Sequence, residues 1–516
     1  MYIHRMIVLL LSAWWLPAAF AGMDSNEQRE AVSDGLRQEY SAIKAQQKPW
    51  LETMDLVAGQ QVKQRAEQNI PTVTDEDLQL RPELMHSLMT QALNSHNLHV
   101  LESLTAVYRQ QPWADAVLLA RAEGMIARFQ GHYTRAVETY RRLYETHADD
   151  KRIVLDTAAI LFEDRQWKEA DRLFAEAETD LAVPEGVRDN IRVYRRKIES
   201  AGNWHIGGSA SVAYDKNVND AAPAYCSPLG CVDQKTENAV GIHYQASVEK
   251  NTPLVGHHNL LFRSYLNGSS YYLDKKSQYD HAFGRAYLGW QYQTARTGLN
   301  VLPFYQGQLS GSDRWRAKAE RSHTLKMALF SQAFGIQTAL SHQINPRLQF
   351  FASAETYRQR YREPERAERS NGQHYSLYAS LAYKPLPAHT VFVGLGGGIV
   401  KPEKTELKGR INNTGNIRRS VSGGWRAVWP KLGGLNMQIQ TAYTDRRYRG
   451  QALNTDFEWQ QQRNRETAYS ISVAHPKLSV AKLIPKLTWE QQRIYSTHKW
   501  AVRRNNRIVV EIEKTF

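Results

Sequence analysis

The chain is poor in cysteine and has no long apolar run beyond its first residues. Only Cys226 and Cys231 are present among 516 residues. After residue 21 no stretch approaches the ~18 apolar residues that a membrane-spanning helix needs, and the mean hydropathy is −0.57. These absences exclude a protein built from transmembrane helices.

Motifs that carry enzyme or cofactor chemistry are also missing. The 17 histidines form no H-E-x-x-H pattern, and the chain has neither a G-x-S-x-G elbow nor a P-loop. The sequence therefore predicts no catalytic residues, no metal site and no cofactor. Catalytic side chains scattered around a barrel rim, as in some outer-membrane enzymes, remain an alternative because such residues leave no local motif.

The first residues read as an export signal. His4 and Arg5 precede an apolar segment at residues 6–16, which Pro17 and the small residues around Ala21 follow. A basic start, a short apolar core and a small-x-small site are typical of a secretory signal peptide. We predict a signal peptide at residues 1–21 with cleavage after Ala21, and an uncleaved anchor is the alternative.

The export signal bears on the two cysteines. Cys226 and Cys231 lie close together in a long polar connection. In an oxidising compartment such a pair is typical of a small local disulfide, which we predict here. Free or metal-bound thiols are the alternative.

Charge is distributed unevenly along the chain. The net charge is +14, but residues 1–202 are slightly acidic and residues 203–516 are strongly basic. For an exported chain, the expected anionic neighbours are lipopolysaccharide phosphates or an acidic substrate, and not nucleic acid. The charged runs at residues 358–369 and 404–419 are interpreted as solvated loop ends that face lipopolysaccharide.

Residues 22–202 are expected to form a periplasmic helical domain. Within it, a repeat of 34 residues, the length of a tetratricopeptide repeat, pairs residues of the same kind. The pairs are Gly124 with Ala158, Tyr133 with Trp167, Ala136 with Ala170, Tyr140 with Phe174 and Leu143 with Ala177. The small residues let two helices approach, and Tyr140 and Phe174 are expected to fill the gap to the next hairpin. The pattern resembles tetratricopeptide repeats over about residues 81–184, and it predicts either a surface that binds a partner or a rigid spacer.

From residue 203 the apolar period changes from 3.6 to 2, which indicates β-strands. One example is Val240, Ile242 and Tyr244, which alternate with polar residues. Fourteen strands are predicted, an even number as in bacterial outer-membrane barrels. They are residues 203–215, 238–250, 258–272, 279–294, 298–310, 331–344, 347–361, 372–385, 390–401, 420–429, 435–449, 465–475, 486–496 and 507–516.

The connections between these strands alternate between short turns and long polar loops, which favours a membrane barrel at residues 203–516 over a soluble sandwich. The fold class is therefore α + β, with N-terminal helical repeats and a C-terminal 14-stranded antiparallel transmembrane β-barrel. Gly394, Gly396 and Gly398 are interpreted as sites of close packing or curvature on its inner face. The last strand carries Ile508, Val510, Ile512 and Phe516 on one face. That pattern is similar to the signal that the outer-membrane barrel assembly machinery reads.

Helical repeats joined to a fourteen-stranded barrel near Trp204 resemble the surface lipoprotein assembly modulators, the Slam family. The most specific stretch is similar to the family's Tyr-Asp-x-Asn-(Val/Ile)-Asn signature and contains Tyr214, Asp215, Asn217 and Asn219. Lys216 occupies the third position, where a small polar residue is common.

The resemblance implies translocation of specific lipoproteins across the outer membrane and their display on the cell surface. It implies as clients the transferrin-, lactoferrin-, haemoglobin- and complement-factor-binding lipoproteins. The further partners expected are the outer membrane with its lipopolysaccharide, the barrel assembly machinery and periplasmic chaperones, with a monomeric barrel and no enzyme activity. The alternative is an exopolysaccharide export porin with a periplasmic repeat domain.

Overall fold

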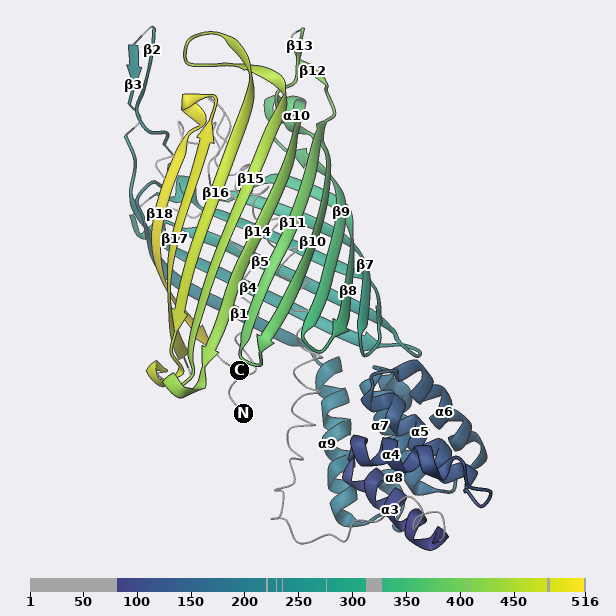
Figure 1. The fold of residues 1–516 in the computed structure, drawn as a ribbon. Coiled ribbons are helices and arrows are strands. Elements are labelled where there is room, and N and C mark those ends of the chain that lie inside the picture. The colour runs from purple at the N-terminus through teal and green to yellow at the C-terminus, as the bar shows by residue number, and fades with distance from the viewer. Residues whose placement is uncertain are drawn as a thin grey trace.

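The computed structural model describes residues 81–219, 221–228, 230–233, 235–274, 276–311, 327–407, 409–479 and 483–514. The predicted signal peptide, its cleavage site after Ala21 and the terminal Phe516 lie outside these ranges. The described chain forms a bundle of helices followed by a closed barrel (Figure 1). No helix in these ranges is long and apolar enough to cross a membrane.

The helical domain consists of antiparallel helix pairs and a longer final helix. Its elements are α3 (Pro82–Ser95), α4 (Leu98–Tyr108), α5 (Ala116–Phe129), α6 (Tyr133–Thr146), α7 (Lys151–Glu163), α8 (Trp167–Thr179) and α9 (Glu185–Gly202). Asn97, Asp115 and Asp150 cap α4, α5 and α7, because their side chains accept hydrogen bonds from the first helical amides. The tetratricopeptide-like architecture predicted from the 34-residue period is confirmed.

Small residues allow the paired helices to approach closely. A Cβ atom at Gly124 would lie 2.6 Å from the ring of Tyr140. Tyr140 thus packs against the other helix of its own hairpin, and it also belongs to the buried cluster that contains Val154 and Ala158 of the next hairpin. Phe174 reaches onward as well, since its ring stacks on Tyr194 of α9 at 4.9 Å.

Ion pairs fasten α9 to the preceding repeat. Arg195 bridges Asp171 at 3.0 Å and Glu178 at 2.7 Å, and Arg192 contacts Glu178 at 3.2 Å. The hydrogen bond from Arg195, with that from Arg192, holds the pKa of the Glu178 carboxyl below its ordinary value. This last helix therefore closes the repeat stack and leads directly into the barrel.

Fourteen antiparallel strands close the barrel, as predicted. In chain order they are β1 (His205–Asp215), β4 (Ala239–Pro253), β5 (His258–Ser270), β6 (His281–Gln293), β7 (Thr297–Ser310), β8 (Ala328–Asn345), β9 (Leu348–Tyr361), β10 (Gly372–Leu386), β11 (His389–Pro402), β14 (Asn416–Trp429), β15 (Leu435–Leu453), β16 (Trp459–Ala474), β17 (Leu483–Ser496) and β18 (Arg503–Lys514).

Loops at one end of the barrel carry small elements of their own. These are the hairpins β2 (Tyr225–Ser227) with β3 (Gly230–Val232) and β12 (Glu406–Leu407) with β13 (Arg410–Ile411), and the helix α10 (Pro364–Ser370). The helical domain lies at the opposite end, where the connections are short (Figure 1). The long-loop end is therefore extracellular and the helical end periplasmic.

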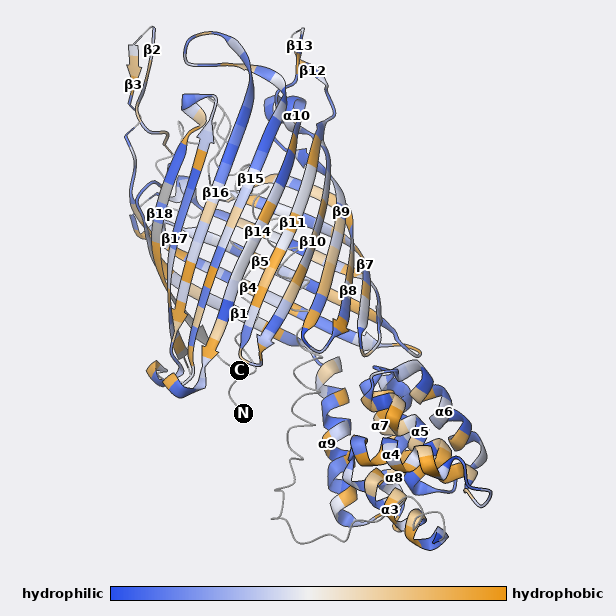
Figure 2. Cartoon of the chain, in the orientation of Figure 1, coloured by the Kyte–Doolittle hydropathy of each residue, from blue (hydrophilic) through white to orange (hydrophobic). Residues whose placement is uncertain are grey.

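Side chains alternate between the two faces of the barrel wall. On β10, Tyr375, Leu377, Leu381 and Tyr383 point outward and are exposed, so that tyrosines bracket an apolar stretch as in an interfacial girdle. Figure 2 shows apolar residues interspersed along the strands and hydrophilic residues concentrated at the extracellular end. An outward apolar band is what a bilayer requires.

Candidate functional site

The barrel closes through a short seam between its first and last strands. β1 pairs with β4 at eleven positions, from His205 to Asp215. Among the described residues, β1 pairs with β18 at only three, namely Ala210 with Ile512, Ser211 with Glu511 and Val212 with Val510. By contrast β18 pairs with β17 at twelve positions. Because ladder hydrogen bonds hold a barrel shut, the seam is the least paired join in the described part of the barrel.

The outer surface beside the seam is apolar. Ile206, Val212, Ile508 and Val510 are each more than half exposed, and in the membrane such side chains face lipid. Two members of the predicted assembly signal, Ile508 and Val510, thus lie on the outward face of β18. Ile512 belongs to the same strand, but its side chain and all of Phe516 lie outside the described residues.

The signature residues hold the extracellular end of β1. The Asp215 carboxylate accepts a hydrogen bond of 2.6 Å from the hydroxyl of Tyr271 and lies 3.3 Å from Nε2 of His243. His243 in turn contacts Ser269 at 2.6 Å. These partners lie on β4, at the end of β5 and directly after it, so Asp215 ties the seam strand to β4 and to the end of β5. Tyr214, one residue earlier, is exposed on the outer face.

Two asparagines of the signature shape the loop that follows. The Asn217 side chain bonds both the amide and the carbonyl of Ala221. Asn219 accepts from the amide of Glu237 at 2.9 Å and donates to the carbonyl of Lys235 at 3.0 Å. Between them Val218 is buried against Ala239 and Tyr271. The motif therefore fixes both ends of the first extracellular loop, a structural role that needs amide side chains at these two positions.

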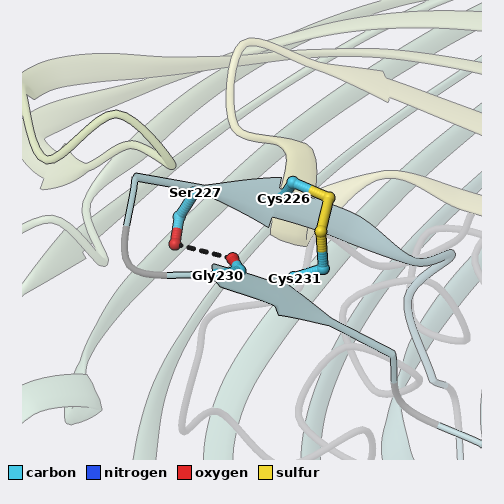
Figure 3. The surroundings of a disulfide bond; sticks show 4 residues. All are labelled: Cys226, Ser227, Gly230 and Cys231. Carbon is cyan, nitrogen blue, oxygen red and sulfur yellow. Dashed lines mark hydrogen bonds between the residues drawn. A yellow bond between two sulfur atoms is a disulfide. The ribbon is translucent and has the colours of Figure 1, made fainter.

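The same loop carries the disulfide. Cys226 and Cys231 are bonded with an S–S distance of 1.95 Å across the hairpin of β2 and β3 (Figure 3). Ser227 adds a hydrogen bond of 3.0 Å to the carbonyl of Gly230. The hairpin tip is thus closed by both a covalent bond and a hydrogen bond.

Inside the barrel, arginines are paired with glutamates. Arg285 contacts Glu355 at 3.0 Å, and both side chains are fully buried. The Arg285 guanidinium also lies 4.1 Å over the ring of Phe304. Arg446 pairs with Glu466 at 2.9 Å. Removing one partner of such a buried pair typically costs about 3–5 kcal/mol, so these pairs fix the inner wall and neutralise part of its positive charge.

The inward glycines of β11 accommodate large side chains of neighbouring strands. A Cβ at Gly394 would meet the Tyr378 hydroxyl at 2.2 Å, and one at Gly398 would meet Nε of Arg418 at 2.6 Å. At Gly396 the nearest atom is Oγ of Ser420, at 2.4 Å. Close packing inside the lumen explains all three positions, as the sequence suggested.

The helical domain contacts the barrel through the loops inside its hairpins. Asp164, in the loop between α7 and α8, accepts a hydrogen bond of 2.8 Å from Nε2 of His257 in the turn between β4 and β5. Arg296, in the turn between β6 and β7, donates to the carbonyl of Gln130 at 3.2 Å. The docked loops belong to successive repeats, so the repeat spacing matches the spacing of periplasmic turns.

Removal of the Asp164 carboxylate is expected to loosen this docking. In an Asp164→Ala variant, His257 loses its buried acceptor, and the amides around residues 130 and 295 should exchange hydrogen several-fold faster because the loops separate more often. Asp149 is exposed in the same domain, and Asp149→Ala serves as the matched control. Equal exchange rates in both variants would contradict the assigned role of Asp164.

Within the part of the chain that the structure describes, no group of His, Cys, Asp and Glu residues is arranged to hold a metal ion. The functional geometry is instead that of a closed barrel with a short seam, a clasped first loop and a docked periplasmic repeat domain. Together these define an outer-membrane β-barrel protein with a periplasmic tetratricopeptide domain. The N-terminal domain is periplasmic, in agreement with the sequence prediction.

Two family models match this chain, one over the barrel and one over the helical repeats. The family model described as surface lipoprotein assembly modifier matches residues 204–516, and the model of that family's N-terminal tetratricopeptide repeats matches residues 71–174. The chain belongs to the surface lipoprotein assembly modifier family. The expected family is thereby confirmed, and the exopolysaccharide exporter loses support.

Three relatives illustrate the range of similarity. Surface lipoprotein assembly modifier 2 of Neisseria meningitidis is 40% identical over 459 residues, covering 88% of this chain and 90% of its own. Surface lipoprotein assembly modifier of Pasteurella multocida is 27% identical, covering 86% and 85%. The hemophilin secretion modulator of Acinetobacter baumannii is 25% identical but covers 42% and 48%.

Proposed function

We propose that this outer-membrane protein moves specific lipoproteins from the periplasm to the cell surface and releases them through its β1–β18 seam. The observation that carries the proposal is the seam itself, in which the described residues form three paired positions beside a β1–β4 ladder of eleven. A barrel that only conducts solutes has no need of a weak join in its wall. A protein that translocates a lipid-anchored client needs such a join, because the acyl chains must stay in the membrane while the polypeptide crosses it.

The helical domain captures the client in this scheme and presents it at the seam. α9 ends at Gly202 and β1 begins at His205, so the repeat stack is covalently continuous with the seam strand. Its hairpin loops hold the domain against the turns that follow β4 and β6. A client bound to the repeats is thereby kept close to the periplasmic end of β1.

The clients are lipoproteins of the kind that bind transferrin, lactoferrin, haemoglobin or complement factors, and periplasmic chaperones deliver them. One relative is named a hemophilin secretion modulator, which supports a client that leaves the periplasm. The chain itself is exported by its signal peptide with cleavage after Ala21, which leaves a helical domain from residue 22 and a barrel from residue 203. The barrel assembly machinery inserts that barrel by reading the C-terminal signal formed by Ile508, Val510, Ile512 and Phe516. No catalytic step is involved, and the barrel functions as a monomer.

Reconstitution tests the proposal. Liposomes that contain the full-length protein and are loaded with a matching lipoprotein should expose that lipoprotein to external protease. Loaded liposomes without the protein should keep the lipoprotein protected. The liposomes that contain the protein should show neither ion conductance nor oligosaccharide efflux above that of empty liposomes. Client-independent efflux of oligosaccharides would favour export of a polysaccharide and would contradict translocation of lipoproteins.

A further inference from the structure

Outward-facing arginines gather on neighbouring strands near the extracellular end of the barrel. Arg419 of β14, Arg447 of β15, and Arg463 and Arg465 of β16 form this arginine cluster, and Asp445 is the acidic residue among them. Asp445 pairs with Arg447 at 2.9 Å and with Arg463 at 2.7 Å. No described residue forms a salt bridge with Arg419 or Arg465, so the cluster keeps a net positive charge.

The strand register places these side chains side by side. Arg419 is opposite Asp445, which is opposite Arg465, and Arg447 is opposite Arg463. Directly opposite residues on one face of an antiparallel pair lie ~5 Å apart at Cβ. The four guanidinium groups therefore converge on one patch, whereas the inward arginines Arg285 and Arg446 are paired with glutamates.

The cluster sits at the height of lipid headgroups. Toward the periplasm, the same outward faces continue with Tyr443 of β15 and Tyr469 of β16 and then with Ile439 and Ile471. Tyrosines mark the membrane interface of such barrels, and the apolar residues beyond them face acyl chains. The arginines follow the tyrosines on the extracellular side, where the phosphates of outer-leaflet lipids lie.

An apolar hollow of about 500 Å³ adjoins the cluster on the same face. It is lined by Ile336, Tyr375, Leu377, Gly397 and Ile417, and by Arg419 at one edge. Gly397 contributes to its depth, since a Cβ there would meet nothing closer than 3.8 Å.

The hollow and the cluster occupy the same two rows of the sheet. One row runs from Thr356 through Tyr375, Ile399 and Ile417 to Arg447. The other runs from Ala354 through Leu377, Gly397 and Arg419 to Asp445. The strands lean in Figure 1, so rows perpendicular to them descend from the extracellular side at β16 toward the membrane interior at β9.

We propose that this face binds a phosphorylated glycolipid of the outer leaflet, with its phosphates on the arginine cluster and an acyl chain in the adjoining hollow. Arginine suits this ligand because its planar fork donates two hydrogen bonds to one phosphate. A continuous path from a cationic patch into an apolar hollow fits a ligand that carries both phosphate and acyl chains. The site needs only the barrel's place in the outer membrane and does not depend on client translocation.

Native mass spectrometry of the purified full-length protein tests this proposal. The probes are bisphosphorylated hexa-acylated lipid A, the same lipid without phosphates, and phosphatidylglycerol. We expect the bisphosphorylated lipid A to bind at least about tenfold more tightly than either of the others, because each lost charge-assisted contact weakens binding substantially. Equal affinity for the dephosphorylated lipid or for phosphatidylglycerol would overturn the assignment.

Two variants separate headgroup from acyl recognition. Arg419→Gln with Arg465→Gln leaves the ion pairs of Asp445 intact and should weaken binding of the phosphorylated lipid about tenfold or more. Gly397→Phe fills the hollow and should weaken binding of the phosphorylated and dephosphorylated forms alike. Arg135→Gln with Arg142→Gln removes the same charge from exposed positions of the helical domain and should change nothing. Wild-type affinity in the Arg419/Arg465 variant, with unchanged heat-modifiable mobility as proof of folding, would disprove the site.

Discussion

Oxidation of a Val212→Cys, Val510→Cys variant is expected to abolish surface display of the client, and reduction is expected to restore it. The two residues are directly opposite each other in the seam. Both are more than half exposed on the outer face, so the new disulfide leaves the lumen unobstructed. It adds a covalent bond that no client can open to a join in which the described residues form three pairs. Display is measured by antibody binding to intact cells under oxidising and reducing conditions.

A second cysteine pair provides the matched control. Val473 of β16 and Leu487 of β17 are also opposite each other and exposed on the outer face, but they belong to a fully paired ladder. Oxidation of a Val473→Cys, Leu487→Cys variant should leave display unchanged. If display continued with the β1–β18 seam fully cross-linked, release through the seam would be ruled out, although passage through the lumen would remain.

Substitution of Gly124 by valine is expected to unfold the helical domain at a much lower temperature and to remove display. A Cβ at this position would lie 2.6 Å from Cε2 of Tyr140. The Tyr140 ring cannot move aside, because it is fully buried and its hydroxyl donates to the carbonyl of Arg121 at 3.1 Å. Overpacking of this kind costs about 1–3 kcal/mol, which corresponds to roughly 4–12 °C in a domain of this size.

The measurement is thermal unfolding of the full-length protein followed by its helical circular dichroism, with heat-modifiable mobility reporting on the barrel. Gly186 in α9 is the control, since no atom lies within 4 Å of a Cβ placed there. Gly186→Ala should keep or slightly raise the unfolding temperature. An unchanged temperature in Gly124→Val would show that the helices do not pack through Tyr140 as described.

Period and alternation were sufficient to predict the architecture. Each of the fourteen predicted segments corresponds to one strand, because the lipid and the lumen impose opposite demands on alternate residues. The largest errors lie at extracellular ends. β14 begins at Asn416, where residue 420 was predicted, and β16 begins at Trp459, where residue 465 was predicted. There the strands extend beyond the membrane into polar sequence, so the apolar alternation that marks a strand is lost.

Features that depend on how distant strands pair could not be predicted from the sequence. The short seam is a property of how β1 meets β18, residues almost three hundred positions apart. The signature at Asp215 was recognised as a motif, but its partners Tyr271 and His243 are distant in the chain. The sequence showed that residues 203–516 carry an excess of basic residues. It did not show on which face of the barrel wall those residues lie. Arg285 and Arg446 of the lumen are paired with glutamates, and an unneutralised group faces outward because three strands, β14, β15 and β16, bring it together.

The central claim, that this protein carries lipoproteins to the cell surface, is tested most directly by surface display in cells with and without it. Each candidate lipoprotein is probed on intact cells by antibody and by external protease, with its total amount measured in parallel. The account predicts that at least one lipoprotein stays abundant but disappears from the surface when this protein is absent, and returns when it is restored. Equal display of every lipoprotein in both strains would contradict the account.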